Sequence, residues 1–173
     1  MDATQDTIRS EIVALLPRLR RFALALTGNR ADAEDLVQDT VERALRHLGQ
    51  WQPGTRLDSW MFRIAQNHFI DGRRSAKRKR QSLTEAANML SGAAQDGARD
   101  AEARLTWMQT CSALATLPQE QRSALALVLI DGMSYRDAAD VLGVPIGTLT
   151  SRLARARDAL AVKIFGSDAD LRS

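Results

Sequence analysis

The side chains best suited to binding a charged or polar partner lie at positions 133–157, where hydroxyl and arginine residues follow one another along the second of two expected helices. Ser134 and Asp137 have the spacing of a capping box at a helix start. Gly143 ends that helix, and Pro145 marks the bend before a second one. This arrangement predicts a helix-turn-helix whose second helix enters a DNA groove. The alternative is an ordinary helical hairpin with a solvated basic face.

The helix expected after Pro145 has an apolar stripe at positions 146, 149, 153 and 156, so one of its faces can pack against the protein. On the other faces, arginine can bind phosphates or guanine edges, whereas threonine and serine donate at shorter reach. The candidate DNA-binding side chains on those faces are Thr148, Thr150, Ser151, Arg152, Arg155 and Arg157.

Composition and charge narrow the possible functions. A chain of 173 residues can form one medium domain or two small ones. Its net charge of +3 is modest but uneven, with acidic residues concentrated at 32–42 and basic ones at 73–80, so different faces are expected to meet different partners. Cys111 is the single cysteine and has no Cys or His at metal-ligand spacing, which predicts a small core residue.

The amino terminus lacks the basic and apolar regions of a signal peptide. The longest strongly apolar run, at 124–130, is too short to span a bilayer. We therefore expect a cytoplasmic protein.

Helical periodicity appears almost everywhere and strand alternation almost nowhere, which predicts an all-α protein. Thr55 and Asp58 have the spacing of a cap for a long helix that runs into the basic cluster. Few large apolar residues follow, so we expect two small helical domains joined by a flexible linker. The expected boundaries are 1–80 for the first domain, 81–100 for the linker and 101–173 for the second domain, which contains the helix-turn-helix.

Enzymatic chemistry has little support in the sequence. Asn67, His68 and Asp71 lie close together, but no third ligand or nucleophile is spaced to join them. We expect no catalytic residue, no metal and no cofactor.

Three blocks in series resemble the extracytoplasmic function (ECF) group of bacterial RNA polymerase sigma factors. They are DAEDLVQDTVERAL, SWMFRIAQNHFIDGRR and LPQEQRSALALVLIDGMSYRDAADVLGVPIGTLTSRLARAR. The first two correspond to region two of the family and the third to region four. Together with their connections they cover nearly the whole chain.

The resemblance implies that the helix near residue 40 docks on a coiled coil of the largest polymerase subunit. The matching positions are Asp35, Gln38, Asp39 and Glu42. Carboxylates accept charge-assisted hydrogen bonds from arginine, so this face suits an arginine-rich partner. A solvated helix face is the alternative.

In the resemblance, the loop at 50–56 captures a flipped base of the minus-ten promoter element. Trp51 offers a stacking surface and Asn67 an amide for a base edge, although Trp51 could instead cap the hydrophobic core. The basic cluster is expected to hold DNA phosphates. The candidate DNA-binding residues of region two are Trp51, Arg63, Asn67, Asp71, Arg73, Arg74, Lys77 and Arg78.

Region four is expected to read the minus-thirty-five element. By position, Thr150, Ser151, Ala154 and Arg155 match family residues that approach base edges, whereas Thr148, Arg152 and Arg157 are better placed for phosphates. The family often has Lys or Arg where Thr150 stands, so this chain lacks one long cation.

The resemblance therefore implies a sigma factor that binds core RNA polymerase and promoter DNA and starts transcription of a stress-responsive or signal-responsive regulon. It separates DNA strands by trapping unstacked bases and hydrolyses nothing. An anti-sigma factor is an expected partner, and no insertion into a membrane is expected. The alternative is a stand-alone helix-turn-helix regulator, which would need only the last unit.

Overall fold

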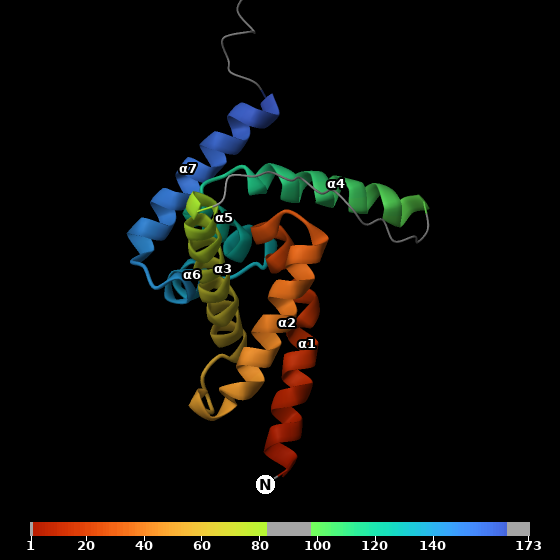
Figure 1. The fold of residues 1–173 in the computed structure, drawn as a ribbon, viewed down its shortest axis with the longest axis vertical. Helices are drawn as coiled ribbons and strands as arrows, with labels where there is room; N and C mark the ends of the chain where they lie inside the picture. The colour runs from red at the N-terminus through yellow and green to blue at the C-terminus, as the bar shows by residue number, and fades with distance from the viewer. Residues whose placement is uncertain (1, 83–97, 166–173) are drawn as a thin grey trace, which may run out of the picture.

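The structure is a computed structural model that describes residues 2–82 and 98–165, and within these ranges it is entirely helical (Figure 1). The predicted all-α class is confirmed. Side chains are described for residues 6–73 and 102–162. Within the described part of the chain, no helix is both long and apolar enough to cross a membrane.

The amino-terminal unit consists of α1 (Asp2–Thr27), α2 (Arg30–Arg46), the short 3-10 helix η1 (Leu48–Gln50) and α3 (Leu57–Ser82). The three long helices pack on one another. In their core, the rings of Phe22 and Phe62 meet edge to face with centroids 5.0 Å apart. Between α1 and α2 the chain reverses at Gly28, whose φ of +78° favours glycine. Asn29 then caps α2 by accepting from the backbone N–H of Asp32.

The predicted cap of the third helix is wrong. The Thr55 hydroxyl instead donates to the carbonyl of Gln52 at 2.7 Å, which closes the preceding turn. Helix α3 begins at Leu57, and the Asp58 carboxylate accepts from the backbone N–H of its neighbour Ser59 at 2.7 Å. Asp58 is therefore held within the first turn, where an acidic residue is favourable, but it makes no capping box with Thr55.

The carboxy-terminal unit consists of α4 (Ala98–Ala115), α5 (Gln119–Leu125), the π-helical turn η2 (Ala126–Ile130), α6 (Tyr135–Leu142) and α7 (Ile146–Phe165). The predicted helix-turn-helix is formed by α6 and α7. The Ser134 hydroxyl accepts from the backbone N–H of Asp137 at the start of α6. Gly143 ends α6 in the left-handed conformation, with φ of +64°.

The two units pack against each other. Helix α4 lies across the carboxyl-terminal end of α1, and α1 also contacts α5 and η2 (Figure 1). Helix α3 contacts α6. Buried residues of both units form one hydrophobic cluster. The sequence predicted two small helical domains but not this contact between them. Most of the expected linker, 83–97, lies outside the described residues.

Cys111 is fully buried in α4, as the sequence predicts for a core residue. Burial raises the pKa of its thiol to about 12. We expect this thiol to stay unreactive toward a chromogenic disulfide reagent in native buffer at mildly alkaline pH, because the thiolate is the reacting species. It should react fully once denaturant unfolds the chain. Rapid stoichiometric labelling of the native protein would contradict the assigned burial.

Candidate nucleic-acid and protein interfaces

The acidic face of α2 consists of Asp35, Gln38, Asp39 and Glu42, and all four side chains are exposed. The opposite side of the helix is in the core through Leu36 and Val37. Within the face, the Gln38 amide donates to the Glu42 carboxylate at 3.1 Å. The structure therefore places the four predicted polymerase-binding residues together on one accessible helix surface.

His68 on α3 contacts one of these carboxylates. Its Nε2 lies 2.7 Å from Oδ2 of Asp39. The imidazole is 22 % exposed and the carboxylate 50 % exposed, so this contact fixes one edge of the acidic face while leaving the carboxylate open to solvent. In the sequence, His68 was considered only beside Asn67 and Asp71, as part of a catalytic or metal site that was not expected. The link between α2 and α3 was missed because the two residues are 29 positions apart.

Trp51 follows η1 and is half-buried against the hydrophobic core. Its indole N–H is shielded from solvent and has no hydrogen-bond partner in the described structure. A buried donor without an acceptor is energetically costly, so the packing of Trp51 against the core leaves its indole N–H unsatisfied. Asn67 is exposed on α3.

The remaining region-two candidates lie along α3. Arg63, Asp71 and Arg73 are exposed, and the Arg73 guanidinium lies 5.7 Å from the centre of the Phe69 ring. Arg63 donates to the backbone carbonyl of Asp140 in α6 at 2.7 Å. Arg74, Lys77 and Arg78 belong to α3, but their side chains lie outside the described ones.

Helix α7 turns Leu149, Leu153 and Ala156 into the core. Its opposite side exposes Thr150, Ala154, Arg155 and Arg157, whereas Thr148, Ser151 and Arg152 are partly buried. The predicted packing face is therefore present at three of its four positions, whereas Ile146, at the first residue of α7, is 49% exposed.

Several polar groups of α7 already have partners. The hydroxyls of Thr150 and Ser151 donate to carbonyls one turn back, at 2.9 Å each, so their oxygens remain available as acceptors. Arg152 lies 3.0 Å from a Glu120 carboxylate oxygen, and Arg157 donates to the Tyr135 hydroxyl at 3.3 Å. A DNA phosphate at Arg152 would have to compete with Glu120.

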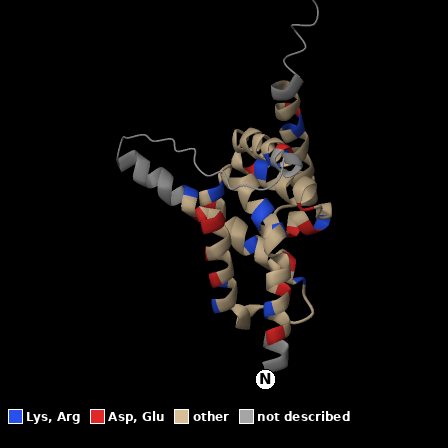
Figure 2. Cartoon of the chain, turned by 90° about the vertical axis from the view of Figure 1, so that its right-hand side faces the viewer, with Lys and Arg blue, Asp and Glu red and all other residues tan. Residues whose placement is uncertain are grey.

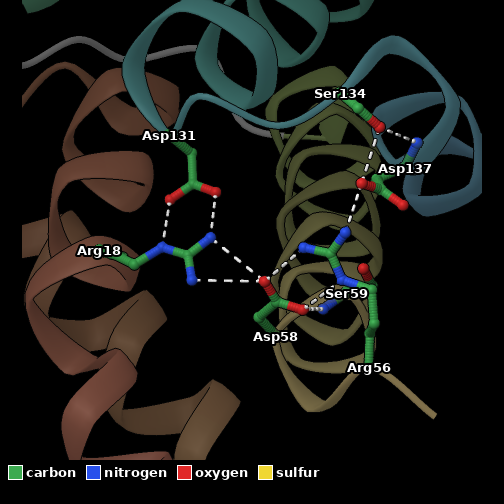
Figure 3. A network of polar contacts seen from close by, with 7 residues as sticks. All are labelled: Arg18, Arg56, Asp58, Ser59, Asp131, Ser134 and Asp137. Atoms are coloured by element: carbon green, nitrogen blue, oxygen red, sulfur yellow. Dashed lines mark hydrogen bonds and ion pairs between the residues drawn. The ribbon is translucent and has the colours of Figure 1, made fainter.

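Sequence reasoning missed a polar network that joins the two units, which we call the interdomain charge cluster: Arg18, Arg56, Asp58, Asp131 and Asp137 (Figure 3). Arg18 donates to both oxygens of Asp131, at 2.9 and 2.7 Å, and more weakly to Asp58. Arg56 donates to both oxygens of Asp58, at 3.1 and 2.8 Å, and also to Asp137. No local pattern reveals such a network, because Arg18 and Asp131 are 113 positions apart.

The cluster stabilises the charged forms of Arg18 and Asp58. The hydrogen bond to Asp131 raises the pKa of Arg18 against the opposing effect of burial. Burial alone would raise the pKa of Asp58, but hydrogen bonds from Arg56 and Ser59 and the charges of Arg56 and Arg18 hold that pKa below its ordinary value. Near neutral pH Arg18 and Asp58 are therefore ionised.

Arg122 of α5 forms a separate link between the units. Its buried guanidinium donates to the carbonyls of Leu26 at 2.5 Å and Leu117 at 2.8 Å, and also to that of Ala115. Burial, together with the charge of Arg73, lowers the pKa of Arg122 to about 10, so it stays protonated near neutral pH. Within the described residues, no group of three or more His, Cys, Asp or Glu could hold a metal ion.

Two family models match the chain: "Sigma-70 region 2" at residues 12–79 and "Sigma-70, region 4" at residues 112–160. The ECF RNA polymerase sigma factor EcfG of Rhodopseudomonas palustris is 40% identical over 165 residues, which span 95% of this chain and 89% of EcfG.

Two solved structures have the same fold. The sigma factor RpoE of Bartonella quintana, solved in complex with the anti-sigma factor NepR, has a TM-score of 0.76 and 34% identity over 91% of this chain and 98% of RpoE. CnrH, solved in complex with the cytosolic domain of CnrY, has a TM-score of 0.68 and 25% identity over 98% of this chain and 91% of CnrH. With both regions matched in order, the chain belongs to the ECF group of RNA polymerase sigma factors, which are not enzymes and direct the polymerase to promoters.

Proposed function

We propose that this sigma factor binds core polymerase through the acidic face of α2, reads the minus-ten element with α3 and the loop at Trp51, and reads the minus-thirty-five element with α7. The observation that carries the polymerase assignment is the exposure of Asp35, Gln38, Asp39 and Glu42 on one helix surface. Exposed carboxylates are accessible acceptors for charge-assisted hydrogen bonds from arginines of a partner.

Promoter reading is divided between two kinds of contact. Arg155 is exposed on α7, one turn beyond Ser151, and its fork of donors fits a guanine edge. Trp51 and Asn67 serve a single base extruded from the duplex, with the indole ring as a stacking surface and the exposed Asn67 amide facing a base edge. Arg73, and by expectation Arg74, Lys77 and Arg78, hold the backbone beside it.

The partners and cellular setting follow from this assignment. RpoE and CnrH were each solved bound to a second protein, an anti-sigma factor in the case of RpoE. An anti-sigma factor is therefore the proposed inhibitor of this chain. The proposed site of action is the cytoplasm, where polymerase and DNA are found, and the proposed regulon responds to stress or to another signal.

Reconstitution with core polymerase tests the proposal. The chain alone should bind duplex promoter DNA weakly, whereas the holoenzyme should bind specifically and transcribe. A double substitution Asp35→Lys and Asp39→Lys should weaken polymerase binding and transcription, because both exposed acceptors become cations. Polymerase binding is measured by fluorescence anisotropy and transcription by run-off assay.

The matched control is Glu11→Lys with Glu102→Lys, which makes the same change in net charge at exposed positions of α1 and α4. It should leave polymerase binding unchanged. Equal affinity of the two double variants would place the polymerase contact on another face. Tight binding of the free chain to a palindrome, without polymerase association, would favour the stand-alone regulator.

The substitution Arg155→Ala should relax selectivity at one upstream base pair and cost about 1 to 3 kcal/mol if the contact has two hydrogen bonds. The comparison variant Arg157→Ala should weaken binding evenly across sequences, because a phosphate contact carries no sequence information directly. Holoenzyme selection from promoters randomised in the minus-thirty-five element measures both effects. An unchanged preference in Arg155→Ala would remove Arg155 from base reading.

Replacing Trp51 or Asn67 by Ala should spare the closed complex but reduce strand opening. A promoter with a pre-melted bubble should restore part of the loss, because the cost of unstacking is already met. Permanganate footprinting of unpaired thymines measures opening. Equal losses on duplex and pre-melted templates, together with a lower melting temperature of Trp51→Ala, would show that Trp51 is only a core residue.

A further inference from the structure

One member of the acidic face of α2 is bonded to a neighbouring helix. Acidic residues recur along α2 from Asp32 to Glu42 (Figure 2). The side chains of Gln38 and Glu42 bond to each other, so that contact stays within α2. Asp39 instead contacts His68 of α3, with 2.7 Å between its Oδ2 and the imidazole Nε2. The position of the Asp39 carboxylate therefore depends on a second helix.

The imidazole of His68 is a restrained donor. Only 22% of its side chain is exposed, and its Nδ1 atom is shielded from solvent. A proton on Nδ1 would be a buried donor without an acceptor in the described structure, which is costly. A proton on Nε2 points instead at the Asp39 carboxylate. The geometry therefore favours the tautomer that carries its proton on Nε2 and donates it to Asp39.

This hydrogen bond restrains Asp39 but leaves it able to bind a partner. Oδ2 accepts from His68, whereas Oδ1 has no partner among the described residues, and the side chain is 50% exposed. With Nδ1 unprotonated the ring is neutral, so the carboxylate keeps its whole negative charge for a cation. A side chain that is already ordered also loses less conformational entropy when a partner binds. The contact therefore favours an arginine that approaches Asp39 from solvent.

We propose that His68 is a positioning residue for polymerase binding, which holds the Asp39 carboxylate with one oxygen free for an arginine of the partner. This inference rests on the proposed function, because it takes the acidic face of α2 as the polymerase contact. It adds a residue of α3 that acts through Asp39. A purely structural role of His68 would change the stability of the fold, whereas a positioning role changes the affinity for polymerase.

Polymerase affinity in the absence of DNA provides the first test, since promoter contacts cannot then contribute. His68→Phe keeps a flat ring but removes the donor, so it should weaken binding of the full chain to core polymerase by about two- to tenfold, the range expected for ordering one side chain. His68→Gln places an amide N–H near the position of Nε2 and should restore most of the affinity. Fluorescence anisotropy measures all three proteins.

The matched control is His47→Phe, because His47 is exposed at the carboxyl end of α2 and contacts Gln50. It should bind polymerase as the parent does. Equal affinities of His68→Phe and His47→Phe would overturn the proposal, and so would a His68→Gln variant that binds as weakly as His68→Phe.

Thermal melting separates positioning from structural support. His68→Phe removes a buried nitrogen that has no partner, so its melting temperature should not fall below that of the parent. Circular dichroism measures this temperature. A loss of polymerase affinity that accompanies lower melting temperatures in both His68→Phe and His68→Gln would show a structural role instead.

The tautomer is tested on the free chain. Nitrogen NMR of the protein labelled at its two histidines should show His68 protonated at Nε2 and unprotonated at Nδ1 in mildly alkaline buffer. His68→Gln identifies the signals by their loss. A ring protonated mainly at Nδ1 would overturn the hydrogen bond to Asp39, whatever the outcome for the proposed function.

A double-mutant cycle with Asp39→Ala shows whether His68 acts through Asp39. The loss caused by His68→Phe should disappear in the Asp39→Ala background, because the carboxylate to be positioned is absent. Additive losses would overturn the positioning role. If Asp39→Ala alone leaves polymerase affinity unchanged, the proposed polymerase contact is wrong at this residue and the inference fails with it. If Asp39→Ala weakens binding and His68→Phe does not, only the inference fails.

Discussion

The pairing of Arg18 with Asp131 is the constraint on which the arrangement of the two units depends. Burying a carboxylate costs several kcal/mol unless a charged partner with good geometry offsets it, and a two-pronged guanidinium offers such geometry. Arg18 also lies 5.5 Å from the centre of the Phe62 ring, so the core of region two helps to hold the cation in place. The Arg18 side chain therefore contacts both the buried carboxylate of Asp131 and the aromatic core of region two.

Features with a local cause were predictable from the sequence. The capping interaction of Ser134 with Asp137 and the left-handed Gly143 follow from neighbouring residues, and so does the buried stripe of α7. Thr55 was assigned wrongly because a hydroxyl can bond backward to a turn carbonyl as readily as forward to a helix N–H. Placing Trp51 against the core needed the packed helices.

The contact between the units could not be predicted for a different reason. The residues that pair across it are up to 113 positions apart in the sequence. An arginine or aspartate in a polar stretch carries no local pattern from which its partner could be predicted. Arg122 illustrates the point. Nothing in the local sequence marks it as buried, yet its guanidinium donates to carbonyls at the carboxyl ends of α1 and α4 and in the turn after α4. The carboxyl end of a helix favours a nearby cation, but the tertiary structure determines which basic side chain lies there.

The contact between the two units combines charged pairs with hydrogen bonds to neutral carbonyls, and these respond differently to ionic strength. Salt should weaken the more exposed contacts, such as that of Arg56, more than the buried pair at Asp131. Separating the units must also break the hydrogen bond from Arg122 to the carbonyl of Leu26, a neutral acceptor whose interaction responds little to ionic strength. A purely electrostatic competitor such as DNA would therefore release only part of the interface. A partner that binds both regions at a fixed separation can offset the whole cost, and core polymerase is the partner expected to hold them so.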